Sequence, residues 1–458
     1  MRFLRFIGLA ALLVAAPAWA AEETVSFDPF DAVTIYGTMS EPKEVVLLLS
    51  GEAGWNPVMV DMARGLADLD ALVVGIDSAA YLKNAATGDK CIFAAGDLES
   101  LSKFLQKKYR LREYRVPTLV GYGSGGTLAY ASLVQGATGP FSGGLSLGFC
   151  PLLKTAKPLC EGRGLAWSDD AGVGATLKPA PGLEVPWSAL QGALDRSCDP
   201  VSIRSFVEHV PQGELITLPG VGHGFAEPRT WMPRLQAAFA RVSPKDAVSN
   251  TPVAAAVRDL PLVEVTATGN PGQGFAVLLT GDGGWARLDR DLGAALADRG
   301  VPVVGFSTLT YFWTKRTPQQ AADDLARVIA HYAAAWGKPT VTLIGYSFGA
   351  DVMPFLVRRL PADARARVRK VALLGLSDTA TFEFSVTGWL GADTPDGLPV
   401  APEIAALRGV PLLCVYGVDE TDSACRALPD ETVRKLETRG GHHFGDDVAP
   451  IVSAILAP

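Results

Sequence analysis

Short apolar runs alternate with longer amphipathic segments along most of the chain. Continuous apolar runs at residues 276–279, 341–344, 371–374 and 411–415 are typical of parallel strands that are buried on both faces. A further segment, residues 319–332, has apolar side chains at helical spacing and follows Pro318, a residue favoured at the start of a helix. Strands that alternate with helices predict βαβ units, and therefore an α/β fold with mostly parallel sheets flanked by helices.

The same series of landmarks occurs twice. The sequence LLSGEAGW at residues 48–55 returns as LLTGDGGW at 278–285, TLVGYGSG at 118–125 returns as TLIGYSFG at 342–349, and GVGHGF at 220–225 returns as RGGHHF at 439–444. Residues 243–259 between the halves are rich in Pro, Ser, Asn and Ala and lack periodic pattern. We therefore predict two tandem domains of one fold, residues 21–245 and 259–458, joined by a linker at 246–258.

The first twenty residues have the pattern of a secretory signal. Arg2 and Arg5 precede an apolar run at residues 6–16, and the sequence AWA at residues 18–20 offers small side chains around a cleavage point after Ala20. A membrane-spanning helix would need about 20 apolar residues. We therefore expect a signal peptide at residues 1–20 and an exported, periplasmic protein.

Composition narrows the classes of partner. The formal net charge is −7, and no run rich in Lys and Arg stands out, so nucleic acid is not an expected partner. The chain has six cysteines, an even number that favours disulfide bonds in an exported protein. Cys414 and Cys425 are predicted to pair, whereas the other four cysteines could pair in three ways. No metal-binding spacing is present, and no cofactor is expected.

The strongest candidate for chemistry is the sequence GYSFG at residues 345–349. An apolar strand precedes it and a helix-forming stretch, residues 350–360, follows, which is the context of a nucleophile elbow in an α/β-hydrolase. Ser347 would be the nucleophile. A serine needs a base, and α/β-hydrolases have the chain order Ser, acid, His. His442 is preferred over His443 because it aligns with His223 in the repeat.

Three acids follow the predicted strand near residue 415. Asp419 is the first choice for the third member of the triad, with Asp422 and Glu420 as rivals; Asp422 gains support if Cys198 is aligned with Cys425, because it then matches Asp195. The acid would hold the imidazole tautomer and stabilise its cation.

The oxyanion of the tetrahedral intermediate needs N–H donors. The backbone N–H of Phe348, directly after the nucleophile, is expected to supply one, and the loop at residues 281–284 with Asp282 and Gly283 is expected to supply the other.

The first half lacks the nucleophile. Gly123 stands opposite Ser347 in the repeat, and Ser124 lies one position later, although His223 and Asp195 are retained. We expect a degenerate hydrolase-like domain with a binding or scaffolding role. A shifted triad through Ser124 is the alternative.

The signal peptide, the duplicated halves and the sequences GYSFGAD (345–351), TGDGGW (280–285) and GGHHF (440–444) together resemble the bacterial VirJ/AcvB virulence-factor family, and the two-domain AcvB type most closely. The resemblance implies a periplasmic hydrolase of lysyl-phosphatidylglycerol, an aminoacylated membrane lipid, linked to virulence. It also implies that Ser347 and His442 are catalytic.

Such a substrate makes further demands on the site. A cationic lysyl group favours a nearby carboxylate, for which Asp282, Asp351 and Asp378 are candidates. Peripheral contact with membrane lipid would need an apolar surface, which Trp313 could form with other aromatic residues, namely Phe312, Phe382, Phe384 and Trp389. Two other hypotheses stay open: a different periplasmic esterase or thioesterase, and a non-enzymatic accessory protein of a secretion system.

Overall fold

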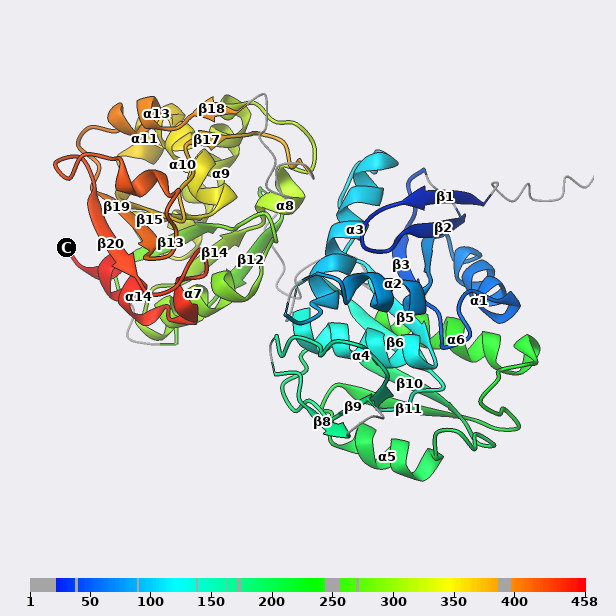
Figure 1. The fold of residues 1–458 in the computed structure, drawn as a ribbon. Coiled ribbons are helices and arrows are strands. Elements are labelled where there is room, and N and C mark those ends of the chain that lie inside the picture. Colours follow the sequence, from blue (N-terminus) through cyan, green and yellow to red (C-terminus); the bar gives the residue numbers. More distant parts are fainter. Residues whose placement is uncertain are drawn as a thin grey trace, which may run out of the picture.

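The computed structural model describes residues 22–37, 40–88, 90–136, 139–162, 164–170, 174–243, 256–268, 272–385 and 397–458. The predicted signal peptide and most of the predicted linker lie outside these residues. Two halves, residues 22–243 and 256–458, are each built on one large sheet with helices on both faces, and they lie side by side (Figure 1).

The first sheet has eight strands in the order β1-β2-β4-β3-β5-β6-β10-β11. Strands β1 and β2 are antiparallel to their neighbours, and the other pairs are parallel. The strands are β1 (Glu23–Ser26), β2 (Ala32–Gly37), β3 (Glu44–Leu49), β4 (Ala71–Ile76), β5 (Thr118–Tyr122), β6 (Gly143–Leu147), β10 (Trp187–Gly192) and β11 (Gly213–Leu218).

The second sheet has seven strands in the order β12-β14-β13-β15-β16-β19-β20, of which only β12 is antiparallel to its neighbour. The strands are β12 (Leu262–Val265), β13 (Gly274–Leu279), β14 (Val303–Phe306), β15 (Thr340–Tyr346), β16 (Val368–Leu374), β19 (Leu412–Gly417) and β20 (Arg434–Thr438). This order repeats that of the first sheet from β2 onward, strand for strand. The predicted α/β class is therefore confirmed, and the sequence repeat corresponds to a repeat of the fold.

Apolar clusters cover both faces of each sheet, as parallel strands with continuous apolar runs require. In the first half the helices are α1 (Pro57–Ala67), α2 (Ser78–Ala85), α3 (Ala94–Lys108), α4 (Ser124–Gly136), α5 (Pro200–Glu208) and α6 (Pro228–Val242). In the second half they are α7 (Arg287–Asp298), α8 (Thr308–Tyr311), α9 (Pro318–Ala335), α10 (Phe348–Arg359), α11 (Ala362–Arg365), α13 (Ala401–Ala405) and α14 (Ala449–Leu456). Helix α9 begins with a capping box between Thr317 and Gln320, and Pro318 occupies its first turn as predicted.

Smaller elements complete the two halves. They are β7 (Leu152–Leu153), β8 (Trp167–Asp170) and β9 (Gly174–Leu177) in a three-stranded sheet, β17 (Thr379–Ala380) and β18 (Leu398–Pro399) in a two-stranded sheet, and the 3₁₀ helices η1 (Ala424–Arg426) and η2 (Phe444–Asp446). Among the described residues, no helix combines the length and apolar character that a membrane span requires.

All six cysteines form disulfide bonds. Cys414 pairs with Cys425, as predicted, and the remaining bonds are Cys91–Cys160 and Cys150–Cys198. The Cys414–Cys425 bond ties the middle of β19 to η1, and therefore restrains the loop that follows β19 at the carboxyl end of this strand.

Candidate active site

Ser347 lies on a sharp turn between β15 and α10. Its φ of 52° and ψ of −120° are uncommon for a residue with a side chain, and strain of this kind is concentrated at functional sites. The flanking glycines are needed for this turn. A Cβ on Gly345 would lie 2.3 Å from the carbonyl oxygen of Gly349, and a Cβ on Gly349 would lie 2.3 Å from that of Leu279. The turn therefore has the geometry of a nucleophile elbow.

The Ser347 hydroxyl faces a histidine that is itself held by an acid. Nε2 of His442 lies 2.9 Å from Oγ of Ser347, and Nδ1 of His442 lies 2.5 Å from Oε1 of Glu420. A Cβ on Gly375 would lie 2.6 Å from Cε1 of His442, so this glycine leaves the space that the imidazole occupies. The three side chains form the continuous hydrogen-bonded chain that a serine hydrolase needs.

The acid beside His442 is Glu420, one of the two predicted rivals, and not the first choice, Asp419. The backbone N–H of Glu420 donates to the Gly417 carbonyl, and Oε2 of Glu420 accepts the N–H of Gly417, so the turn after β19 folds the Glu420 side chain inward. Glu420 is buried, whereas Asp419 and Asp422 are exposed.

The repeat contains a signal that could have identified this acid. Asp195 lies three residues after Gly192 at the end of β10, and Glu420 lies three residues after Gly417 at the end of β19. Alignment on these strand ends pairs Asp195 with Glu420, whereas alignment on the cysteines pairs it with Asp422. Strand ends fix where a loop begins, but a cysteine within the loop does not.

Electrostatics prepare His442 to act as a base. Desolvation lowers the pKa of His442, but the hydrogen bond and the charge of Glu420, together with the charges of Asp282 and Asp351, outweigh it, and the net pKa is raised above its ordinary value. Burial raises the pKa of Glu420, but the hydrogen bonds from His442 and Gly417 lower it overall, so Glu420 stays ionised. His443 takes no part in the hydrogen bonds that link Ser347, His442 and Glu420. Its Nδ1 is 2.9 Å from the Tyr346 hydroxyl, and desolvation lowers its pKa.

The glycine-rich loop after β13 is pinned next to the elbow. The Gly281 carbonyl accepts a hydrogen bond from the Thr308 hydroxyl at 2.7 Å and one from the Gly284 N–H at 3.1 Å. These bonds fix the peptide that joins Gly281 to Asp282, and thus the direction of the Asp282 N–H. The N–H of Gly349 donates to the Thr280 carbonyl at 3.1 Å, which ties this loop to the first turn of α10, where Phe348 lies.

Thr308 was not identified from the sequence, although the repeat contains a signal for it. The N–H of Thr308 donates to the Thr280 hydroxyl, and in the first half the N–H of Ser78 donates to the Ser50 hydroxyl, both at 3.0 Å. The hydroxyl pair therefore recurs at matching strand ends in both halves.

Two further carboxyl groups influence His442. Desolvation raises the pKa of Asp282, and it raises the pKa of Asp351 to about 7, while the charge of His442 lowers both values. Asp351 also accepts the N–H of Ser377 at 2.8 Å. Asp378 is exposed, in contrast to the other two carboxyl groups. Of the three candidate partners for a cation, the structure brings Asp282 and Asp351 to the site.

The expectation for Trp313 is wrong. Its side chain is 2% exposed and lies between Tyr114 and Phe384, and its Nε1 donates to the Leu111 carbonyl of the first half at 2.7 Å. Phe312, Phe382 and Phe384 are also buried, and Trp389 lies outside the described residues. Trp313 and Phe384 are buried in a cluster with Tyr114 of the first half. Phe312 and Phe382 are buried in the core of the second half.

The corresponding place in the first half has an acid and a histidine but no nucleophile. Oδ2 of Asp195 lies 2.9 Å from Nδ1 of His223, while Gly123 takes the elbow position with a φ of 54°. A Cβ on Gly123 would lie 2.7 Å from Oε2 of Glu52. Ser124 is the first residue of α4 and makes no hydrogen bond to His223, although both residues are described.

The acid and histidine of the first half lie beside a cysteine sulfur. Ligand atoms of Asp195, Cys198 and His223 lie within 4.8 Å of one another, as in a metal site. The Cys198 sulfur is bonded to Cys150, however, and a disulfide sulfur is not the thiolate that binds metals.

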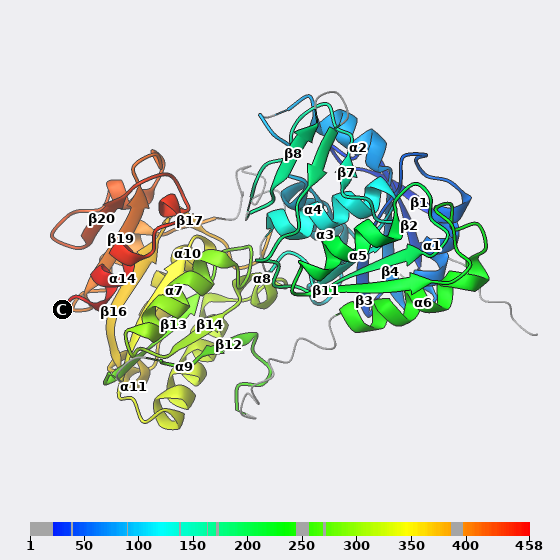
Figure 2. The ribbon, with the colours of Figure 1, turned by 90° about the horizontal axis from the view of Figure 1, so that it is seen from below.

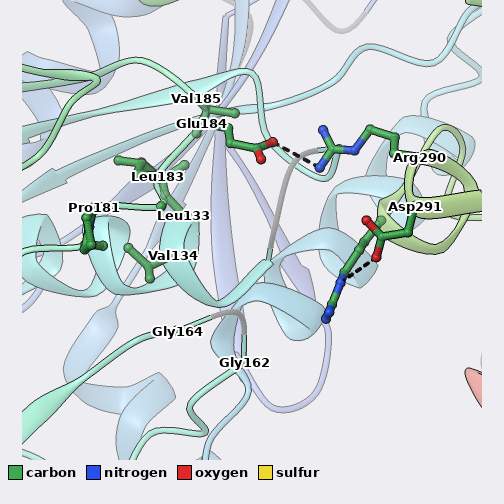
Figure 3. A pocket seen from close by; sticks show the side chains of 13 residues that line it. Leu133, Val134, Gly162, Gly164, Pro181, Leu183, Glu184, Val185, Arg290 and Asp291 are labelled. Carbon is green, nitrogen blue, oxygen red and sulfur yellow. Dashed lines mark hydrogen bonds and ion pairs between the residues drawn. The ribbon is translucent and has the colours of Figure 1, made fainter. Parts of the chain in front are cut away.

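A cavity of about 500 Å³ lies at the junction of the two halves, and none of the triad residues lines it. Its apolar wall includes Leu133 and Leu183 of the first half, and its polar side is formed by α7 (Figure 3). Arg290 of α7 forms an ion pair with Glu184 across the junction at 3.1 Å.

Residues 273–458 match the family model of the bacterial virulence protein VirJ. No curated protein matches the chain. Among solved structures, a serine hydrolase without a lid from Xanthomonas campestris has 19% identity and a TM-score of 0.32, and the match covers 50% of this chain and 97% of that chain.

Two further solved structures show the same pattern of coverage. Esterase 2 from Thermogutta terrifontis has 14% identity and a TM-score of 0.34, with 49% of this chain and 97% of that chain covered. A putative dienelactone hydrolase from Klebsiella pneumoniae has 12% identity and a TM-score of 0.35, with 48% and 96% covered. The match to the VirJ family model agrees with the resemblance seen in the sequence and extends over residues 273–458, which form most of the second half.

Proposed function

We propose that the protein is a serine carboxylic-ester hydrolase that acts in the periplasm on the aminoacyl ester of lysyl-phosphatidylglycerol. The observation that carries the hydrolase activity is the chain from Ser347 through His442 to Glu420, with distances of 2.9 and 2.5 Å, on a strained elbow. The resemblance to the VirJ family suggests the lipid substrate, and the pattern of residues 1–20 suggests export.

The residues have defined roles in this reaction. Ser347 Oγ attacks the lysyl carbonyl carbon while His442 Nε2 takes the hydroxyl proton, and the N–H groups of Phe348 and Asp282 receive the oxyanion. The bond to the glycerol oxygen then breaks, and His442 returns the proton to that oxygen. Water, activated by His442, attacks the lysyl–Ser347 ester, releases lysine and restores Ser347. Glu420 stabilises the His442 cation in both steps.

The carboxyl groups around the triad favour a cationic acyl group. Asp282 and Asp351 both raise the pKa of His442 through their charge, so whichever of these carboxyl groups is ionised contributes a negative field at the triad. An ammonium group that enters this field gains a favourable interaction in a partly desolvated place. An ester with a neutral acyl group lacks this gain.

The test is lysine release from vesicles of phosphatidylglycerol and lysyl-phosphatidylglycerol by the mature protein, compared with Ser347→Ala. Release by the wild type that is abolished in the variant supports the proposal. Hydrolysis of a short-chain p-nitrophenyl ester without lysine release would retain the esterase and reject the lipid substrate.

Asp351→Asn separates recognition of the cation from chemistry. The asparagine oxygen can still accept the Ser377 N–H, so the fold of the loop is kept. We expect KM for the lysyl lipid to rise about tenfold, equivalent to about 1.4 kcal/mol, with KM for the neutral ester unchanged. An equal effect on both substrates would contradict recognition of a cation by Asp351.

A further inference from the structure

The two halves meet through a buried contact near the active site. Helix α3 and the loop after it, from the first half, pack against α8 and the residues that follow it in the second half (Figure 2). Tyr114, Leu309, Trp313 and Phe384 form an apolar cluster there. Lys107 adds a hydrogen bond from its Nζ to the Trp313 carbonyl at 2.6 Å.

Lys103, one turn before Lys107, lies deeper in this contact. Its side chain is 0% exposed. The ammonium is 2.7 Å from Oε1 of Glu99 and lies 5.6 Å from the centre of the Phe384 ring. A buried ammonium is costly unless it is paired and hydrogen-bonded, so each of its polar partners is important.

One of those partners is the loop beside the nucleophile. Lys103 Nζ donates to the backbone carbonyl of Asp282 at 3.2 Å, across a sequence separation of 179 residues. Desolvation raises the pKa of the Asp282 carboxyl and the charge of Lys103 lowers it, so the ammonium influences the side chain of Asp282 as well as its carbonyl.

The two peptides on either side of Asp282 are therefore fixed from different halves. Thr308 of the second half holds the Gly281 carbonyl, and Lys103 of the first half holds the Asp282 carbonyl. Gly283 and Gly284 follow directly, and glycines give a loop the freedom to move when it is not held. Preorganised donors are effective because they need no rearrangement during the reaction.

We propose that Lys103 is a positioning residue that holds residues 281–284 of the second half, the oxyanion loop, so that the first half, which lacks a nucleophile, completes the active site of its neighbour. This inference rests on the proposed serine hydrolase activity. It assigns the first half a role in catalysis that needs no ligand of its own.

Lys103→Met in the full chain tests the proposal, with Lys107→Met as the matched control. Both lysines lie on α3 and donate to a carbonyl of the second half, but only Lys103 contacts the oxyanion loop. With a short-chain p-nitrophenyl ester, we expect kcat of Lys103→Met to fall about 10- to 100-fold, somewhat less than the loss of a whole oxyanion donor, with KM nearly unchanged. Lys107→Met should retain kcat within about twofold.

A structural role alone would lower the thermal midpoint of both variants without this split between kcat and KM. Because Lys103→Met leaves Glu99 without its cation, Glu99→Gln/Lys103→Met is the second variant, compared with Glu99→Gln. A folded double variant with the kcat of Glu99→Gln would overturn the proposal.

The results also separate the two proposals. If the wild type neither reacts with a fluorophosphonate at Ser347 nor hydrolyses the ester, the proposed activity itself fails. If it does both and the two lysine variants behave alike, only the role of Lys103 fails.

Discussion

At the residue scale, the acid of the triad depends on a turn of four residues. Glu420 folds back onto the end of β19 and reaches His442, while its neighbour Asp419 points to solvent. The two acids are adjacent in sequence and similar in chemistry, so the sequence of this loop alone could not choose between them; only alignment of the two halves on their strand ends pairs Asp195 with Glu420. The choice comes from the hydrogen bonds between Gly417 and Glu420, which are a property of the folded turn.

Glu420→Gln should therefore lower kcat about 10³- to 10⁴-fold, because the amide leaves His442 in the wrong tautomer and cannot stabilise its cation. Asp419→Asn is the matched control and should retain nearly full activity. Steady-state kinetics on a p-nitrophenyl ester distinguishes the two. The reverse order of effects would show that Asp419 is the functional acid.

The pH profile of kcat/KM reports the state of His442. The base must be neutral, so activity falls as pH decreases through the pKa of His442, which is raised above its ordinary value of about 6.5. For the wild type, we expect the midpoint of the acid limb of the kcat/KM profile to lie above a pH of about 6.5. In the residual activity of Glu420→Gln the acid limb should move to lower pH, because desolvation of His442 is then opposed only by the charges of Asp282 and Asp351. A limb that does not move would contradict this account of the pKa.

At the scale of elements, the elbow between β15 and α10 is the best predicted part of the site. The pentapeptide, the strand before it and the helix after it were all visible in the sequence, since each follows from local pattern and from the steric needs of glycine. The aromatic residues around Trp313 were interpreted wrongly. Trp313 and Phe384 are buried by contact with helix α3 and the loop after it, more than 200 residues away, which no local pattern encodes, whereas Phe312 and Phe382 lie in the core of the second half.

Gly349→Ala should destabilise the second half, because its Cβ would meet the carbonyls of Leu279 and Thr280 at 2.3 and 2.6 Å. We expect the free energy of unfolding to fall by about 2–4 kcal/mol, together with loss of activity. Urea denaturation measures the first effect. Gly182→Ala is the control, because its Cβ would have no atom within 4 Å and its φ is not positive. Equal stability of both variants would argue against a tightly packed elbow.

At the scale of the whole molecule, two copies of one fold differ at two positions of the triad: Gly123 stands where the second half has Ser347, and Asp195 stands where it has Glu420. The first half keeps Asp195 and His223 in contact and has Gly123 at the elbow. The sequence repeat predicted this correspondence, because the landmarks keep the same order in both halves. It could not predict the contact through which Lys103 of one half reaches the loop of the other, since that contact depends on how the halves pack.

A nucleophile restored to the first half should regain some reactivity. In a Ser347→Ala background, we expect Gly123→Ser combined with Glu52→Ala to be labelled slowly by a fluorophosphonate at position 123. The second change is included because Oε2 of Glu52 lies 2.7 Å from where the Cβ would be. Peptide mass spectrometry locates the label. Absence of label in a folded variant would mean that the first half lacks more than its nucleophile.

The central claim is that Ser347 is the nucleophile of a working triad. The most direct measurement is reaction of the full chain with a fluorophosphonate, followed by peptide mass spectrometry to locate the modified residue. We expect one modified serine, Ser347, with labelling abolished in Ser347→Ala and strongly slowed in His442→Ala. A folded wild-type protein that remains unlabelled at Ser347, or that is labelled equally well without His442, would contradict it.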